Sequence, residues 1–215
     1  MEIHSVYGLF LRPFRRRRMR AFERSFQPAE STTILDVGGT PFNWELAGIR
    51  SQLTLLNLSP LEGSGALPAN YRLVEGSGTQ LEFADGTFDV VFSNSVIEHL
   101  GSWEQQRAFA GEVRRVARGL WVQTPARGFP IEPHLMTPCL HYLPLAWRRR
   151  LLRNFSVWGL IARPSPEAVD DFLRQTRLLG YQEMQELFPD CEIRRERFLG
   201  LTKSYVAVRL ETEVR

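Results

Sequence analysis

The chain has 215 residues, of which 43% are hydrophobic and 24% charged, and its formal net charge is +3. This composition is typical of one globular domain, taken as residues 1–215, and no apolar stretch is long enough to span a membrane. The two cysteines, Cys139 and Cys191, occur in no CxxC or Cys/His spacing, so we expect neither a disulfide framework nor a metal site. A reducing cytoplasm fits this cysteine usage best.

The N-terminal segment, residues 1–30, is expected to be basic and helical over about 12–26. In "VYGLFLRPFRRRRMR" the apolar run precedes the charges, which is the reverse of a signal peptide. Six arginines fall within nine residues: Arg12, Arg15, Arg16, Arg17, Arg18 and Arg20. Beside apolar neighbours they could attract anionic lipid, which would give peripheral membrane contact, or they could form a solvated helix face. Nucleic acid is not an expected partner, because the net charge of the whole chain is small.

Five short apolar runs follow, at 34–36, 53–60, 71–76, 88–95 and 119–125. Helical patterns fill several of the gaps between them, which predicts a mostly parallel sheet wrapped by helices on both faces. Two extended segments about Gly200 then predict a closing hairpin, an antiparallel edge on the same sheet. The expected fold is therefore an α/β fold of about seven strands.

Two predicted helices have clear start and stop signals in the sequence. The first begins at a capping box of Ser102 and Gln105 and should end at Gly119. Its apolar face is formed by Phe109, Val113, Val116 and Leu120. The second begins at Ser165, which is followed by a proline, and should end at Gly180.

Small and polar residues close each of the first four runs. Ligands of open α/β sheets bind at the carboxyl ends of the strands, so these positions are candidate site residues. The first run closes on Asp36-Val37-Gly38-Gly39, and Thr40 should then cap a short helix that ends near Gly48. The next runs close on Asn57, which lies 21 positions after Asp36, on Gly76-Ser77-Gly78, and on Ser93-Asn94-Ser95, with Glu98-His99 just beyond. The GxGxxG dinucleotide fingerprint is absent.

These segments resemble the class I S-adenosylmethionine-dependent methyltransferases, in particular their small-molecule, type 11-like branch. The resemblance covers about residues 33–125. It rests on "ILDVGG", on "LLNLSP" and above all on "GSGTQLEFADGTFDVVFSNSVIEHL", while "RFLGLTKSYVAVR" is similar to the last two strands of that fold. The resemblance implies a Rossmann-like sheet, S-adenosylmethionine as the cofactor, and methyl transfer to a small-molecule, glycan or lipid-linked acceptor.

The resemblance also implies a set of cofactor-binding positions. They are Asp36, Gly38 and Gly39 for the methionine end, Asn57 and Leu58 for the ribose and adenine, Ser77 and Gly78 for the adenine, and Asn94 beneath the methionine portion. Thr40, Asn57 and Ser77 depart from the family pattern, where a glycine and two carboxylates are usual. These departures motivate an alternative function, a non-catalytic binding or scaffold protein with a weakened cofactor site.

Three residues are candidates for catalysis. His99 belongs to the family motif, and His134 stands two positions after Glu132 in the Pro-bounded sequence "IEPH". Alternate residues of an extended segment face the same way, so Glu132 could orient His134 as a general base, or the pair could hold the loop together. The surrounding segment, residues 126–164, is the expected substrate-side insertion. Within it, Trp147 is expected to pack under the helix that carries Arg148-Arg149-Arg150.

Overall fold

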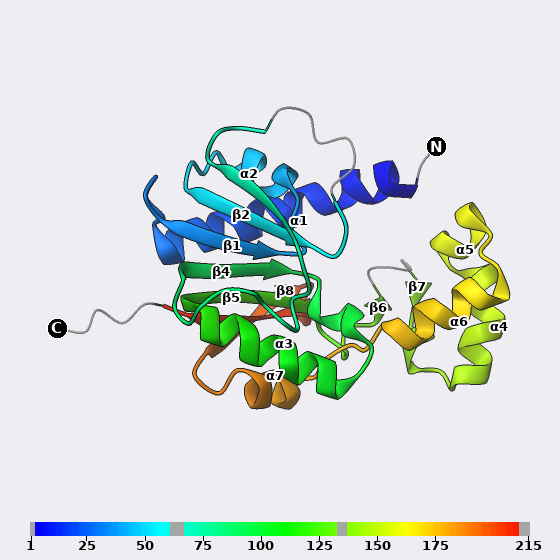
Figure 1. Ribbon diagram of the computed structural model, residues 1–215. Helices are drawn as coiled ribbons and strands as arrows, with labels where there is room; N and C mark the ends of the chain where they lie inside the picture. The colour runs from blue at the N-terminus through cyan, green and yellow to red at the C-terminus, as the bar shows by residue number, and fades with distance from the viewer. Residues whose placement is uncertain (1–2, 61–66, 133–136, 211–215) are drawn as a thin grey trace.

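The structure is a computed structural model that describes residues 3–60, 67–132 and 137–210 (Figure 1). Its centre is a seven-stranded sheet in the order β3-β2-β1-β4-β5-β9-β8. The strands are β1 (Thr33–Val37), β2 (Gln52–Asn57), β3 (Tyr71–Glu75), β4 (Phe88–Asn94), β5 (Ala117–Pro125), β8 (Glu192–Phe198) and β9 (Leu201–Arg209). The first five are parallel to one another, and the predicted fold class is confirmed.

The closing hairpin lies at the predicted edge of the sheet. Strand β9 runs antiparallel to β5, with Trp121 opposite Val208, and β8 runs antiparallel to β9. The last strand therefore lies inside the sheet, and β8 forms the edge.

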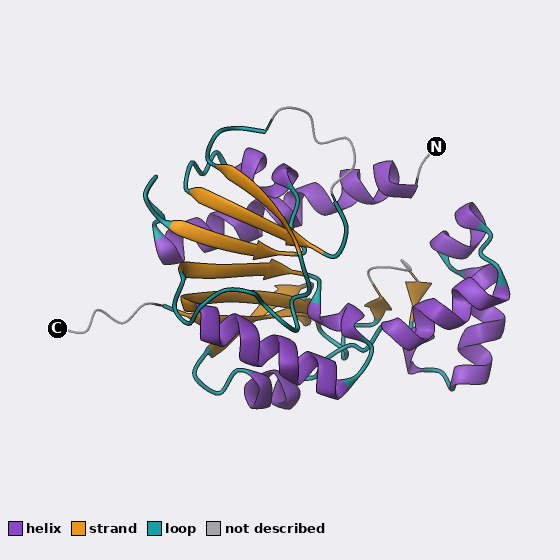
Figure 2. Cartoon of the chain, viewed as in Figure 1, coloured by secondary structure: helices purple, strands orange, loops and turns teal. Residues whose placement is uncertain are grey.

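Helices cover both faces of the sheet (Figure 2). On one face lie α1 (Ile3–Phe26) and α2 (Pro41–Ala47), and on the other lie α3 (Trp103–Val116) and α7 (Tyr181–Leu187). Each face has its own buried apolar cluster, as the alternation of side chains along a strand requires. Within β1, for example, Leu35 belongs to the α3 side and Ile34 to the α1 side.

Helix α1 packs on the sheet through an aromatic cluster centred on Phe22. The ring centroid of Phe22 lies 5.7 Å from that of Trp44, 5.2 Å from that of Phe92 and 5.8 Å from that of Trp121. The helix begins at Ile3, so the predicted start near residue 12 was wrong. The reason is that the helix continues through Pro13, a residue type that usually marks a first turn.

Helix α3 confirms the predicted cap but not the predicted end. The Ser102 hydroxyl accepts a hydrogen bond from the Gln105 amide at 3.2 Å. The helix ends at Val116, and Gly119 lies within β5, where it pairs with Val90. A side chain at Gly119 would come within 3.0 Å of the Asp89 carbonyl oxygen, so this glycine serves close strand packing rather than helix termination.

Helix α6 (Pro166–Gln175) shows a similar difference. Ser165 caps it as predicted, accepting from the Ala168 amide at 3.2 Å. However, the helix stops at Gln175, and Gly180 caps the start of α7, where its amide donates to the Glu183 carboxylate at 2.7 Å. Gly180, which was expected to end one helix, therefore caps the beginning of the next.

Beyond the carboxyl ends of the parallel strands lies a separate group of elements (Figure 1). It contains α4 (Leu145–Phe155), α5 (Val157–Ala162), α6, the small pair β6 (Ile131–Glu132) and β7 (Thr137–Pro138), and the turn η2 (Leu140–Tyr142). Leu140, Leu152 and Val169 form its small core. Trp147 does not pack as expected, because 61% of its surface is exposed.

Candidate functional site

The predicted strand-end residues lie along one edge of the sheet. Val37 pairs with Leu56 on one side and with Ser93 on the other, so the ends of β1, β2 and β4 are neighbours. The loop after β1 is tied to β2 twice. The Gly38 amide donates to the Leu56 carbonyl at 2.7 Å, and the Asn57 side-chain amide donates to the Gly39 carbonyl at 2.9 Å.

The Asp36 carboxyl group lies beneath this loop and is 1% exposed. Its Oδ2 accepts a hydrogen bond of 2.7 Å from Nε1 of Trp44, which is fully buried on α2. Its Oδ1 has no hydrogen-bond partner among the described residues. Burial raises the pKa of Asp36 to about 7, and the Trp44 hydrogen bond opposes that rise. A buried acceptor with an open position therefore lies next to the glycine loop.

The chain's own packing requires both glycines of the loop. Gly38 has a φ of +74°, and a Cβ there would lie 2.5 Å from the side chain of Val96. A Cβ at Gly39 would lie 1.7 Å from Oδ2 of Asp36. The loop backbone thus passes directly over the buried carboxylate, where no side chain fits.

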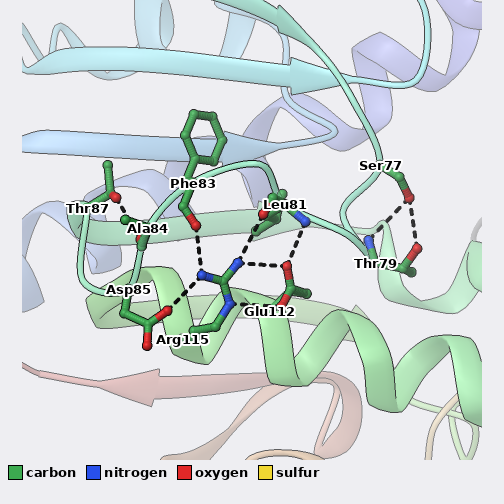
Figure 3. A network of polar contacts seen from close by, with 9 residues as sticks. All are labelled: Ser77, Thr79, Leu81, Phe83, Ala84, Asp85, Thr87, Glu112 and Arg115. Atoms are coloured by element: carbon green, nitrogen blue, oxygen red, sulfur yellow. Dashed lines mark hydrogen bonds and ion pairs between the residues drawn. The ribbon is translucent and has the colours of Figure 1, made fainter.

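The segment after β3 is held by local contacts. The Ser77 hydroxyl lies 2.8 Å from the Thr79 hydroxyl and accepts from the Thr79 amide at 3.3 Å (Figure 3). A Cβ at Gly78 would lie 2.8 Å from Val37, so Gly78 allows this turn to approach β1. Leu58, which follows β2, is 75% exposed. No contact among the described residues fixes the orientation of its side chain.

The connection that leads from this turn to β4 is fastened to α3 by Arg115 (Figure 3). Its guanidinium donates to the carbonyl oxygens of Leu81 at 3.0 Å and Phe83 at 2.7 Å, and to the carboxylates of Asp85 at 2.8 Å and Glu112 at 2.9 Å. The hydrogen bond with Glu112 is the main cause of the raised pKa of Arg115. These contacts hold residues 81–85, which follow the turn of Ser77 and Gly78, against α3.

At the end of β4 the Asn94 side chain meets Arg18 of α1. The Arg18 guanidinium donates to Oδ1 of Asn94 and binds both carboxylate oxygens of Glu196 on β8, at 3.0 and 2.6 Å. Arg18 is 6% exposed, so this member of the arginine cluster belongs to neither a solvated nor a membrane-facing surface.

The three candidate catalytic residues are not brought together by the described contacts. His99 lies in the turn η1 (Ile97–Leu100) after β4, and its side chain is exposed. The preceding Glu98 is buried and accepts a hydrogen bond of 2.9 Å from the Thr124 hydroxyl, which fixes η1 to β5. Glu132 pairs through its backbone with Thr137, and His134 lies outside the described residues.

Two residues that hold the site were not expected from the sequence. Trp44 stands eight positions after Asp36, and only its place on the inward side of a short helix marks it. Arg18 is one of six similar arginines, and nothing local distinguishes it from its neighbours.

Neither a membrane-spanning helix nor a metal cluster occurs in the described parts of the chain. None of the helices there is long and apolar enough to cross a bilayer. No group of three histidine, cysteine, aspartate or glutamate side chains gathers as candidate metal ligands among those same residues.

Five parallel strands closed by a reversed hairpin, with a glycine loop over a buried carboxyl at the end of β1, define a Rossmann-like methyltransferase fold. Residues 38–119 match the family described as a methyltransferase domain. This match covers less than half of the 215 residues, and the matched part of the chain is similar to that family. A stretch of 72 residues is 39% identical to an uncharacterized methyltransferase of Mycobacterium sp. strain JLS; it covers 32% of this chain and 29% of the relative.

Solved structures share the fold at low sequence identity. A 1,6-didemethyltoxoflavin-N1-methyltransferase of Burkholderia thailandensis, with 1,6-didemethyltoxoflavin and S-adenosylhomocysteine bound, superposes with a TM-score of 0.55 and 12% identity over 96% of this chain and 83% of that one. A SAM-dependent methyltransferase of Methanosarcina mazei superposes with a TM-score of 0.50 and 16% identity over 89% and 98% of the two chains.

Proposed function

We propose that the protein transfers a methyl group from S-adenosylmethionine to a small-molecule acceptor. The observation that carries the proposal is the open oxygen of Asp36 beneath the loop of Gly38 and Gly39. The methionine end of the cofactor carries an ammonium group, and a buried carboxylate with one free acceptor position suits that charge, directly or through a water. The methyltransferase domain family that residues 38–119 match supports the same cofactor.

The other expected cofactor positions fit around that contact. The backbone of Gly38 and Gly39 would face the methionine end, and Asn94 would lie beneath it. Asn57 donates to the loop, and its amide oxygen accepts no hydrogen bond from the described residues, so it can accept one from a ribose hydroxyl. Leu58, Ser77 and Gly78 would border the ribose and adenine.

The cofactor supplies a methyl group on a sulfonium, which is transferred by in-line displacement, so the protein's task is chiefly to align the acceptor. Where the acceptor atom bears a proton, a group must take it. Histidine titrates near neutrality, and we propose His99, or His134 oriented by Glu132, for this role.

The acceptor is proposed to be a small molecule, because the Burkholderia structure that shares the fold holds one. A glycan or a lipid-linked precursor would be the alternative acceptor. The elements beyond the carboxyl ends of the strands, in particular α4 to α6, would border the acceptor (Figure 1).

Calorimetric titration with S-adenosylhomocysteine tests the cofactor site. Asp36→Asn keeps an acceptor for Trp44 and removes the charge, so we expect binding to weaken about 10- to 100-fold. Glu192→Gln is the matched control, because it also removes one negative charge, its carboxylate on the edge strand β8 is 66% exposed, and it should bind like the wild type. No binding by the wild type at millimolar ligand would refute the enzyme function and favour the non-catalytic alternative. Equal affinity of Asp36→Asn would refute the role given to Asp36.

A further inference from the structure

A cavity lies between α1 and the β8–β9 hairpin, on the face of the sheet that α1 covers. Its volume is about 430 Å³, which lies in the range of small-molecule sites. We call it the α1–hairpin groove. It is lined by Phe14, Arg17, Ala21, Arg24, Trp121, Arg194, Arg195, Glu196, Arg197, Lys203 and Val206.

Positive charge dominates this groove. Six of the lining residues are basic, but the guanidinium of Arg195 lies over the Tyr181 ring of α7, on the other face of the sheet, which leaves five basic side chains for the groove. The one acidic lining residue, Glu196, is already bound by both arms of Arg18. Arg194 has its own partners on the hairpin and α1. Arg17 and Arg197 form no ion pair with any described residue. The groove therefore holds more positive charge than its own carboxylates neutralise.

Lys203 is a partly buried member of this basic set. Its ammonium lies 3.8 Å from the centre of the Phe14 ring. Burial and the nearby Arg18 lower the pKa of Lys203 to about 8, against the opposing effect of Glu196. A cation kept partly out of water among other cations is stabilised when an anion binds beside it.

Trp121 supplies an independent indication. It lines the groove, is 2% exposed, and packs edge-on against Phe22 and Phe26. Its indole N–H has no hydrogen-bond partner among the described residues. Buried donors in folded proteins normally have an acceptor, and an anionic ligand in the groove would provide one.

We propose that the α1–hairpin groove binds a small molecule that bears phosphate groups. Arginine forks and a lysine ammonium are the groups that proteins use for phosphate oxygens, and the aromatic Phe14 offers a surface for an organic part. The cavity exceeds the size of one phosphate ion, which favours a pyrophosphate or a phosphate ester. Because α1 and β8 enclose it on two sides, it suits a compact ligand better than a nucleic-acid duplex.

The groove adjoins the strand-end site without being part of it. Arg18 joins the two, because the same guanidinium binds Glu196 of the groove and Asn94 at the end of β4. None of the groove residues is among the proposed cofactor positions, so phosphate binding can be measured without S-adenosylmethionine.

Titration with inorganic pyrophosphate, without cofactor, tests the proposal. We expect saturable binding that weakens at least tenfold in Lys203→Met and in Arg197→Gln. Arg16→Gln removes the same charge from an exposed position of α1 outside the groove, and it should leave the affinity unchanged. Equal losses in all three variants would show a general charge effect and overturn the proposal.

The signal of the Trp121 indole N–H gives a second test of ligand binding. It is measured on the folded wild-type protein, so unfolding of a variant cannot account for the result. In a ¹H–¹⁵N spectrum, the indole signal that disappears in Trp121→Phe should move downfield when the wild type is saturated with pyrophosphate, because the N–H gains an acceptor. An unmoved Trp121 signal at saturation would contradict the proposed position of the ligand.

Vesicles containing phosphatidylglycerol distinguish the source of the phosphate. Flotation of the wild type with these vesicles, lost in Lys203→Met and reversed by pyrophosphate, would identify a lipid headgroup. Pyrophosphate binding without flotation would identify a soluble phosphate ester. Absence of both would refute the phosphate site.

Discussion

The buried Asp36 carboxyl should make the stability of the protein depend on pH. Its pKa is about 7 in the folded chain, against 3.8 for the ordinary group. In the unfolded chain the group ionises as the pH passes 3.8, whereas in the folded chain it stays protonated until about 7. Folding is therefore penalised progressively over this window, by about 1.4 kcal/mol for each pH unit and by about 4 kcal/mol in full.

Asp36→Asn removes this titration while it retains an acceptor for Trp44, so the difference between the two proteins isolates the effect. In urea unfolding followed by circular dichroism, the wild type should lose about 3 kcal/mol of unfolding free energy relative to the variant between pH 5 and pH 8. Other titrating groups contribute equally to both proteins and cancel. A difference that stays constant over this range would refute the raised pKa, and one that grows in the opposite direction would mean that the carboxylate is stabilised in the fold.

Two further outcomes can be checked by the same unfolding measurements. Gly39→Ala places a methyl group onto the carboxylate of Asp36 and should lower the free energy of unfolding by roughly 3 kcal/mol or more. Gly48→Ala, at a left-handed position that faces open space, should lower it by only about 1 kcal/mol. Equal costs would contradict the close approach of the loop to Asp36. Arg18→Met leaves the partly buried Glu196 carboxylate, which is 29% exposed, without its guanidinium partner and should cost roughly 2 kcal/mol. Arg20→Met on the exposed side of α1 should change stability by less than about 0.5 kcal/mol, and an equally small effect of Arg18→Met would contradict its role as a link.

The strands and the edge of the sheet that carries the site could be predicted from the sequence. Short apolar runs that end on Asp36, Asn57 and Asn94 are local signals, and parallel strands bring their carboxyl ends together whatever lies between them. The serine caps at 102 and 165 are also local, because an N-cap bonds to an amide only three residues away.

The misplaced helix ends have a different physical cause. Gly119 and Gly180 both looked like helix stops, because glycine favours that position. In the structure, one is required where β5 packs closely against β4, and the other begins a new helix whose Glu183 binds its amide. The structural role of each glycine depends on the residues that surround it in the fold, and a single sequence does not show which residues these are.

The contacts that complete the site were equally beyond local patterns. Trp44 reaches Asp36 only because α2 folds back onto the sheet, and Arg18 reaches Glu196 across 178 positions of the chain. The local hydrogen bonds of Ser77 and Asn57 likewise follow from the turns around them.

The position of β9 between β5 and β8 has a consequence for synthesis on the ribosome. Met19 and Phe22 of α1 share one apolar cluster with Trp121 of β5 and with Val206 and Val208 of β9. Helix α1 therefore finds part of its packing surface only when β9, which follows it by about 175 residues, has left the exit tunnel. Until then, β5 has an unpaired edge and α1 an uncovered apolar side, and a nascent chain that pauses before residue 201 should engage chaperones that a chain released after residue 209 does not.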